Sequence, residues 1–135
     1  ILYDSVLSII GNGVVIDPGV LIEEIDKLAN QGIKIDESLE MLEKANKIKS
    51  NDPYIIDSLG WALFKLERYQ ESKEYLQLAV RLMPSDPIVN DHYGDVLWKN
   101  GNKLQARYYW QYVLNLKKAE KDLKEKIEQK LIEGL

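Results

Sequence analysis

Apolar residues recur at intervals of three and four along most of the chain, which is the spacing of one buried face of an α-helix. In the middle of the chain, this spacing is followed by Ile55, Ile56, Leu59, Leu63 and Leu66. A second series of the same kind begins after a short polar break. The pattern predicts three pairs of amphipathic helices, at residues 18–31 with 36–49, 53–66 with 69–83, and 87–99 with 103–117.

An Asp-Pro pair precedes the first helix of each predicted pair. The three are Asp17-Pro18, Asp52-Pro53 and Asp86-Pro87, and their prolines lie 35 and then 34 residues apart. Aspartate suits the residue before a helix because its carboxylate accepts hydrogen bonds from the free amides of the first turn. Proline suits the first helical position, where no amide donor is needed. The chain is therefore predicted to be built from a repeat of about 34 residues.

Two glycines lie at matching positions in the middle of predicted first helices. Gly60 and Gly94 are 34 residues apart, although glycine inside a helix costs about 0.5–1 kcal/mol relative to alanine. Small residues, Ser72 and Ala106, occupy matching positions on the second helices. We expect these residues to let two helix axes approach closely, so that Gly60→Leu would destabilise the protein by roughly 1–3 kcal/mol.

These columns resemble the tetratricopeptide repeat, a helix–turn–helix unit of about 34 residues. The second unit carries the pattern best, in Leu59-Gly60, Leu63, Tyr69, Leu76, Ala79 and Pro84. The third unit keeps Tyr93-Gly94, Leu97, Ala106 and Trp110. The first unit is degenerate, with Ile25 in place of the glycine and Ser38 in place of the alanine. The resemblance implies an all-α fold of antiparallel helix pairs stacked as a right-handed α-solenoid, similar to the last repeats of larger bacterial proteins.

The predicted array has about three repeats with a flank at each end. Residues 1–17 form an N-terminal flank, with helical spacing at 3–11 that fits a remnant of a preceding repeat. The degenerate repeat covers 18–52, the second repeat 53–86 and the third 87–118. Residues 119–135 are predicted to form a capping helix, because an array needs a polar-faced end. Its predicted apolar stripe consists of Leu123, Ile127, Leu131 and Ile132.

Composition excludes several kinds of chemistry. The chain of 135 residues has no cysteine and a single histidine, His92, so thiolate metal sites, cysteine nucleophiles and two-histidine metal sites are absent from it. The sequence contains no nucleotide-binding or metalloprotease motif. We therefore expect a protein that is not an enzyme and that has no cofactor or metal.

Charge and hydropathy bear on partners and on compartment. The net charge of −4 disfavours nucleic acid as a partner, because the phosphate backbone selects basic surfaces. No apolar run approaches the roughly 20 residues that cross a bilayer, so we expect no membrane insertion. Bacterial cytoplasm and cell envelope both fit the sequence. Whether the chain, which begins with Ile1, is part of a longer repeat protein stays open.

In the family, an extended peptide or a helix usually binds to the concave face, which the first helices line. The residues predicted to line this face here are Tyr54, Asp57, Trp61, Lys65, Ile88, Asp91, His92, Asp95, Trp98 and Lys99. Such an aromatic and acidic groove would suit a peptide with basic and apolar side chains, since tryptophan faces attract cations. The alternative is that Trp61 and Trp98 belong to the core and the aspartates to a solvated face.

One subtype of the family is disfavoured. The subtype that grips a C-terminal carboxylate uses lysine, asparagine and arginine on the first helices, whereas the matching positions here hold Ile22, Asp26, Ser58, Ile88 and His92. The predicted function is a protein–protein interaction scaffold without enzymatic activity. The alternative is a structural module that self-associates, either as a dimer or end to end, which would cover apolar surface at the ends of the array.

Overall fold

A computed structural model describes residues 23, 25–27 and 35–135. The described residues form helices and no strand. The helices with defined bounds are α3 (Asp36–Ile48), α4 (Pro53–Lys65), α5 (Tyr69–Leu82), α6 (Pro87–Lys99), α7 (Lys103–Leu114) and α8 (Lys121–Glu133). The all-α prediction is confirmed. The predicted helix at 3–11, the pair Asp17-Pro18 and most of the predicted helix at 18–31 lie outside the described residues.

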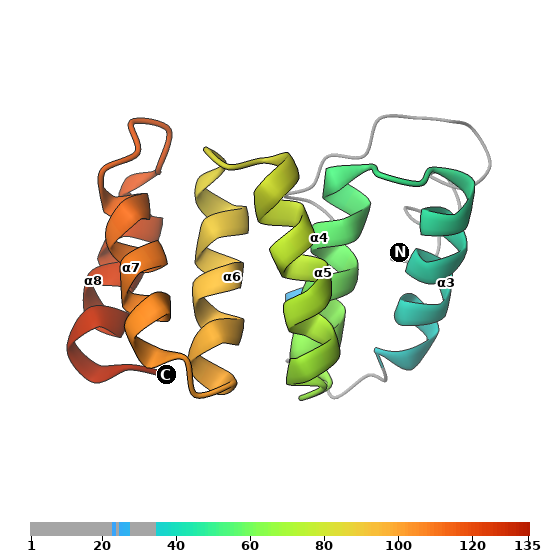
Figure 1. Cartoon of the computed structure of the whole chain (residues 1–135), viewed down its shortest axis with the longest axis horizontal. Helices are drawn as coiled ribbons and strands as arrows, with labels where there is room; N and C mark the ends of the chain where they lie inside the picture. Colours follow the sequence, from blue (N-terminus) through green and yellow to red (C-terminus); the bar gives the residue numbers. More distant parts are fainter. Residues whose placement is uncertain (1–22, 24, 28–34) are drawn as a thin grey trace.

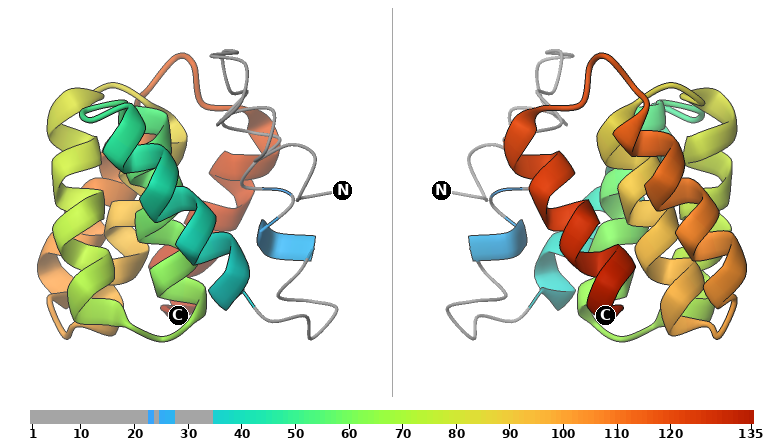
Figure 2. Two further views of the ribbon diagram at one scale, coloured as in Figure 1. Left: turned by 90° about the vertical axis from the view of Figure 1, so that its right-hand side faces the viewer. Right: turned by 90° about the vertical axis from the view of Figure 1, so that its left-hand side faces the viewer.

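The helices pack in sequence order to make a short array (Figure 1). Within the pairs, α4 packs against α5 and α6 against α7, while α3 contacts α4, α5 contacts α6 and α7 contacts α8. The second helices α5 and α7 lie on one side of the array and the first helices α4 and α6 on the other (Figure 2). Since each helix contacts near neighbours in the chain, the predicted α-solenoid is confirmed.

The start of each described first helix follows directly from its Asp-Pro pair. The Asp52 carboxylate accepts hydrogen bonds from the amides of Tyr54 and Ile55 at 3.0 and 3.3 Å. The Asp86 carboxylate does the same for the two matching amides of α6, at 2.9 and 3.0 Å. These contacts satisfy amides that have no partner within the helix, so local sequence fixes where α4 and α6 begin.

The two described turns within helix pairs each contain a residue with a positive φ. Glu67 between α4 and α5 has φ +60°, and Gly101, 34 residues later between α6 and α7, has φ +83°. Glycine adopts this left-handed conformation without the cost that a side chain imposes. The second repeat therefore uses a strained residue where the third uses the residue that fits.

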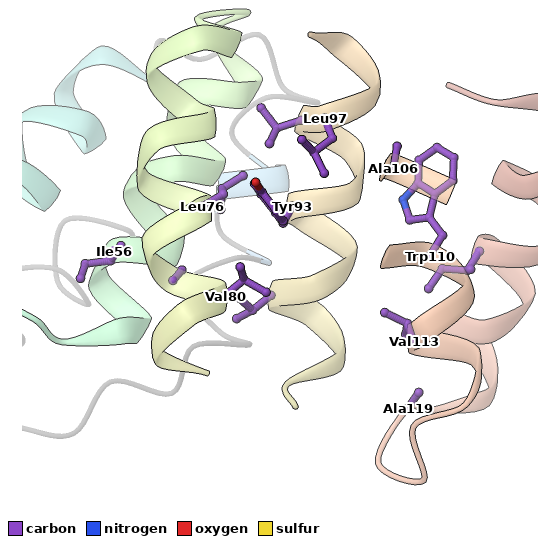
Figure 3. Packing of buried hydrophobic residues seen from close by; sticks show 13 residues of the cluster. Ile56, Leu76, Val80, Tyr93, Leu97, Ala106, Trp110, Val113 and Ala119 are labelled. Carbon is purple, nitrogen blue, oxygen red and sulfur yellow. The ribbon is translucent and has the colours of Figure 1, made fainter. Parts of the chain in front are cut away.

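The two mid-helix glycines permit close contact within each pair, as predicted. A Cβ atom at Gly60 would lie 2.5 Å from the Leu76 Cγ, and a Cβ atom at Gly94 would lie 2.5 Å from the Trp110 Nε1. The Ser72 hydroxyl donates a hydrogen bond to the carbonyl of Gly60 at 2.6 Å. Leu76 and Trp110 belong to the same buried cluster between the helix layers (Figure 3).

The last helix, α8, packs on α7 with a narrower apolar stripe than predicted. Ile127 is fully buried and Leu123 and Leu131 are half-buried, but Ile132 is 83% exposed. The prediction was wrong for Ile132 because it follows Leu131 directly and so points about 100° away from it around the helix axis. The Arg107 guanidinium of α7 donates a hydrogen bond to the Leu131 carbonyl at 2.6 Å and ties the two helices together.

Candidate functional site

The residues predicted to line the binding face divide into buried and accessible groups. Five are buried, namely Asp57, Trp61, Asp91, His92 and Asp95. Tyr54, Lys65 and Trp98 are half-buried, and Ile88 and Lys99 are exposed. The buried members of the set include all three acids. What holds these acids decides what the face can bind.

Asp57 of α4 pairs with His92 of α6. The His92 Nδ1 lies 3.0 and 3.1 Å from the two Asp57 carboxylate oxygens, and the imidazole ring stacks on Trp61 with 4.0 Å between ring centroids. Burial acts to lower the pKa of His92, but the nearby carboxylates of Asp57, Asp91 and Asp95 outweigh it and raise that pKa above its ordinary value. The pair is therefore a buried contact between adjacent repeats that favours the charged imidazolium.

Asp91 and Asp95 of α6 share Lys130 of α8. The Lys130 ammonium lies 2.7 Å from an Asp91 carboxylate oxygen and 2.8 and 2.9 Å from the two oxygens of Asp95. The indole Nε1 of Trp110 also donates to Asp95, at 2.9 Å. Burial, together with the charge of Asp91, raises the pKa of Asp95 to about 6 against the opposing effect of Lys130. Burial alone would lower the pKa of Lys130, but the two carboxylates outweigh it and raise that pKa.

Asp26 makes the corresponding contact at the other end of the described array. Its carboxylate accepts a hydrogen bond from the Trp61 indole Nε1 at 3.1 Å and lies 3.1 Å from the Lys65 ammonium. Lys65 also lies over the Trp61 ring, 4.8 Å from the centroid. Two members of the predicted face are therefore held by a residue that lies 35 positions before Trp61.

These contacts form a regular series. Asp26 with Trp61, Asp57 with His92, and Asp95 with Lys130 each join residues 35 positions apart. We call this series the inter-repeat ladder. Because Lys130 takes part in it, α8 supplies the contact that the first helix of a further repeat would supply. The sequence held a signal for the ladder, since Asp26, Asp57 and Asp95 each have a residue with a hydrogen-bond donor 35 positions later.

The ladder corrects the predicted groove. The prediction of an open acidic surface is wrong for Asp57, Asp91 and Asp95, because these side chains are buried and bonded within the chain. Trp61, which is 7% exposed, belongs to the core, the alternative that the sequence left open. Trp98 is half-buried and stacks on Trp110 with 5.3 Å between ring centroids.

Metal-binding and membrane-spanning features are absent from the described residues. No group of three or more histidine, aspartate or glutamate side chains in that part of the chain is placed so that it could hold a metal ion. None of its helices is both long enough and apolar enough to cross a membrane.

The N-terminal segment matches a second family. Residues 1–54 match adenylosuccinate synthetase. A stretch of 46 residues is 52% identical to the adenylosuccinate synthetase of a Thermoanaerobacter species and covers 34% of this chain but 11% of that enzyme. A stretch of 36 residues is 64% identical to the Heliobacterium modesticaldum enzyme and covers 27% of this chain and 8% of the enzyme. The chain thus matches about a tenth of the length of these relatives, in a region that overlaps the predicted repeat at 18–52, whose bounds stay a prediction.

A repeat family matches the middle of the chain, and solved structures share its fold. Residues 53–86 match the tetratricopeptide repeat. The first such domain of human RPAP3 has a TM-score of 0.65 at 23% identity, covering 87% of this chain and 94% of that domain. The chaperone SycD of Yersinia enterocolitica has a TM-score of 0.69 at 13% identity, covering 90% of this chain and 94% of SycD. The match, the glycine positions and the stacked pairs lead to one conclusion: the chain contains tetratricopeptide repeats.

Proposed function

We propose that the chain is a scaffold that binds a peptide or a helix of a partner protein on the face formed by its first helices. The observation that carries the proposal is a pair of accessible apolar side chains at matching positions. Tyr54 is half-buried at the second residue of α4, and Ile88 is 41% exposed at the second residue of α6. Repetition of one apolar contact in adjacent units suits an extended ligand that crosses both.

A structural relative supports a peptide as the ligand. The first tetratricopeptide domain of Spaghetti, an RPAP3 protein, is recorded bound to an HSP90 peptide, and it has a TM-score of 0.64 to this chain at 24% identity, covering 85% of this chain and 93% of that domain. The two share a fold, so a peptide is a sterically reasonable ligand here. The HSP90 sequence itself is not carried over, because the first helices lack the cationic set that grips a terminal carboxylate.

The ladder changes the expected chemistry of the partner. The acids that were predicted to attract basic side chains already hold His92 and Lys130. A basic partner would have to displace a buried lysine, which leaves the apolar contacts at Tyr54 and Ile88 as the basis of binding. We therefore propose a partner segment with apolar side chains at regular spacing.

We also propose that the chain has no enzymatic activity of its own. The segment similar to adenylosuccinate synthetase spans about a tenth of the length of those enzymes. Enzymes assemble substrate sites from distant parts of a chain, so a piece of this size does not supply a complete site. The alternative of self-association stays a prediction, and light scattering over a range of concentrations tests it.

Selection from a displayed peptide library on the full chain tests the proposed binding face. Enriched peptides are synthesised and their dissociation constants measured by fluorescence anisotropy with the wild type and with Tyr54→Ala/Ile88→Ala. We expect the double variant to weaken binding at least tenfold while circular dichroism stays unchanged. A matched control is Leu82→Ala, since Leu82 is 42% exposed but lies on the second helix α5. Failure to enrich any peptide, or equal binding by the wild type and the double variant, would refute the proposal.

A further inference from the structure

The outward positions of the second helices change character along the array. Three positions, one helical turn apart, can be compared between repeats. They hold Asp36, Glu40 and Lys44 in α3, Gln70, Glu74 and Leu78 in α5, and Leu104, Tyr108 and Tyr112 in α7. The first two of these positions in α7 are strongly exposed, with Leu104 at 85% and Tyr108 at 68%. Because the earlier repeats place charged or polar residues there, this apolar exposure is a property of α7 and not of the fold.

The same region is basic in an acidic protein. Residues 96–119 contain five lysines and arginines and no aspartate or glutamate, whereas the whole chain has a net charge of −4. Lys103 and Arg107 are exposed on α7 and lie one turn apart, next to Leu104 and Tyr108. The hydrogen bond from Arg107 to the Leu131 carbonyl at 2.6 Å holds the guanidinium against α8. The surface therefore combines two apolar side chains with two cations over one helix.

We propose that the α7 stripe, formed by Lys103, Leu104, Arg107 and Tyr108, binds an acidic amphipathic helix of another protein. Leu104 and Tyr108 are spaced to contact the apolar face of such a helix. Lys103 and Arg107 would meet its carboxylates at the edge of the contact, and tyrosine and arginine are residue types that often dominate binding energy. The α7 stripe is separate from the first-helix face, so its partner differs from the peptide or helix proposed to bind there.

A second copy of the chain fits the stripe less well than a foreign helix. The α7 stripe of another copy carries the same positive charge. The acidic helix α3 buries Leu39 and Leu42 in its own array and exposes Ile48 at its last residue, so the described residues of a second copy offer no acidic helix with a continuous free apolar face.

A flat anionic membrane also fits less well. The neighbouring helix α5 exposes Glu71 and Glu74, which a planar surface laid across the second helices would meet. A single helix, about 10 Å wide, can rest on α7 alone. The charge pattern therefore favours a narrow acidic partner.

Titration of the full chain with designed helical peptides tests this proposal. The probe is an 18-residue helix with leucine along one face and glutamate on the other, and a matched probe carries lysine in place of glutamate. Fluorescence anisotropy is measured for the wild type and for Leu104→Gln/Tyr108→Gln, a charge-neutral change that gives α7 a polar outer face as in α5. We expect the glutamate probe to bind the wild type at least tenfold more tightly than it binds the variant. We also expect it to bind the wild type at least tenfold more tightly than the lysine probe does. Raising sodium chloride from 50 to 500 mM should weaken its binding at least threefold.

The other occupants give distinct results. The proposal is wrong if the two probes bind equally, if the variant binds as well as the wild type, or if the glutamate probe fails to bind. Binding of the wild type to vesicles with anionic lipids, without binding to the probe, would assign the stripe to a membrane. A dimer that the variant abolishes would assign it to a second copy. Tyr54→Ala/Ile88→Ala should leave probe binding unchanged, which separates this surface from the first-helix face.

Discussion

Adding a single methyl group at Gly60 should destabilise the protein in a way that depends on one neighbour. The new Cβ would lie 2.5 Å from Cγ and 2.6 Å from Cδ2 of Leu76, closer than carbon atoms can approach. Overpacking of a core costs about 1–3 kcal/mol, while replacing a helical glycine by alanine gains about 1 kcal/mol of helix propensity. The expected net effect of Gly60→Ala is therefore a loss of about 1 kcal/mol.

Removing that neighbour should reverse the sign. Leu76→Ala deletes the two clashing carbons and by itself should cost roughly 2–5 kcal/mol, because it opens a cavity at a fully buried position. In that background, Gly60→Ala should stabilise the protein by about 1 kcal/mol. The two substitutions should thus show a coupling energy of about 2 kcal/mol in a double-mutant cycle.

Urea unfolding, followed by circular dichroism at the helix band, measures all four proteins of the cycle. Equal effects of Gly60→Ala with and without Leu76 would refute the reasoning, because the glycine would then not be required by the close approach of α4 and α5. A change in the slope of the unfolding free energy against urea concentration, without a change in the midpoint, would also count against the reasoning. That slope reports the surface exposed on unfolding and not packing.

Three further predictions concern the ladder and one turn. The folded state raises the pKa of His92 and raises that of Asp95 to about 6, so both groups bind protons more tightly when the chain is folded. The stabilising contribution of Asp95 is lost as the pH rises from about 4 through about 6, and that of His92 is lost as the pH rises above 6.5 through its raised pKa. Calorimetry should therefore give a higher Tm at pH 5 than at pH 8, and a flat or opposite profile would contradict the assignment. Lys130→Met should lower the free energy of unfolding by about 3 kcal/mol, because it leaves Asp91 and Asp95 buried without their cation. In a urea titration, Asp95→Asn in that background should recover part of this loss. No recovery would mean that the substitution removed packing and not a charge contact. Glu67→Gly should raise stability by about 0.5–1 kcal/mol by relieving the left-handed conformation at φ +60°, and a lower urea midpoint would show that this turn is not strained.

The helix pattern was accessible from the sequence because its causes are local. Asp52 and Asp86 accept hydrogen bonds from amides two and three residues away, so the starts of α4 and α6 need no information from the rest of the chain. The predicted positions of the helix ends were less accurate. The second helix of the third pair ends at Leu114, not at 117. Helix ends depend on the packing of the next element as well as on local residues.

The candidate site was only partly accessible. Its residues were found because first-helix positions repeat every 34 or 35 residues, and the sequence left open whether Trp61 lines a groove or the core. The partner of each acid was missed, although each acid of the ladder has a hydrogen-bond donor 35 residues later, because that spacing alone does not show whether a carboxylate such as Asp57 faces solvent or His92. The exposed pair Leu104 and Tyr108 was missed for a related reason, since apolar residues on a helix are expected to be buried.

The sequence by itself thus determined the repeat, the caps, the mid-helix glycines and the all-α architecture, all of which depend on contacts within a turn or on a period along the chain. Only the tertiary structure decided that the acids of the first helices are bonded across repeats, that Lys130 of α8 closes the series, and that the outer face of α7 stays uncovered. The physical reason is that these properties depend on which surfaces stacking brings together. Stacking places side chains 35 residues apart within hydrogen-bonding distance and removes them from water, and neither the distance nor the desolvation is encoded at any single position.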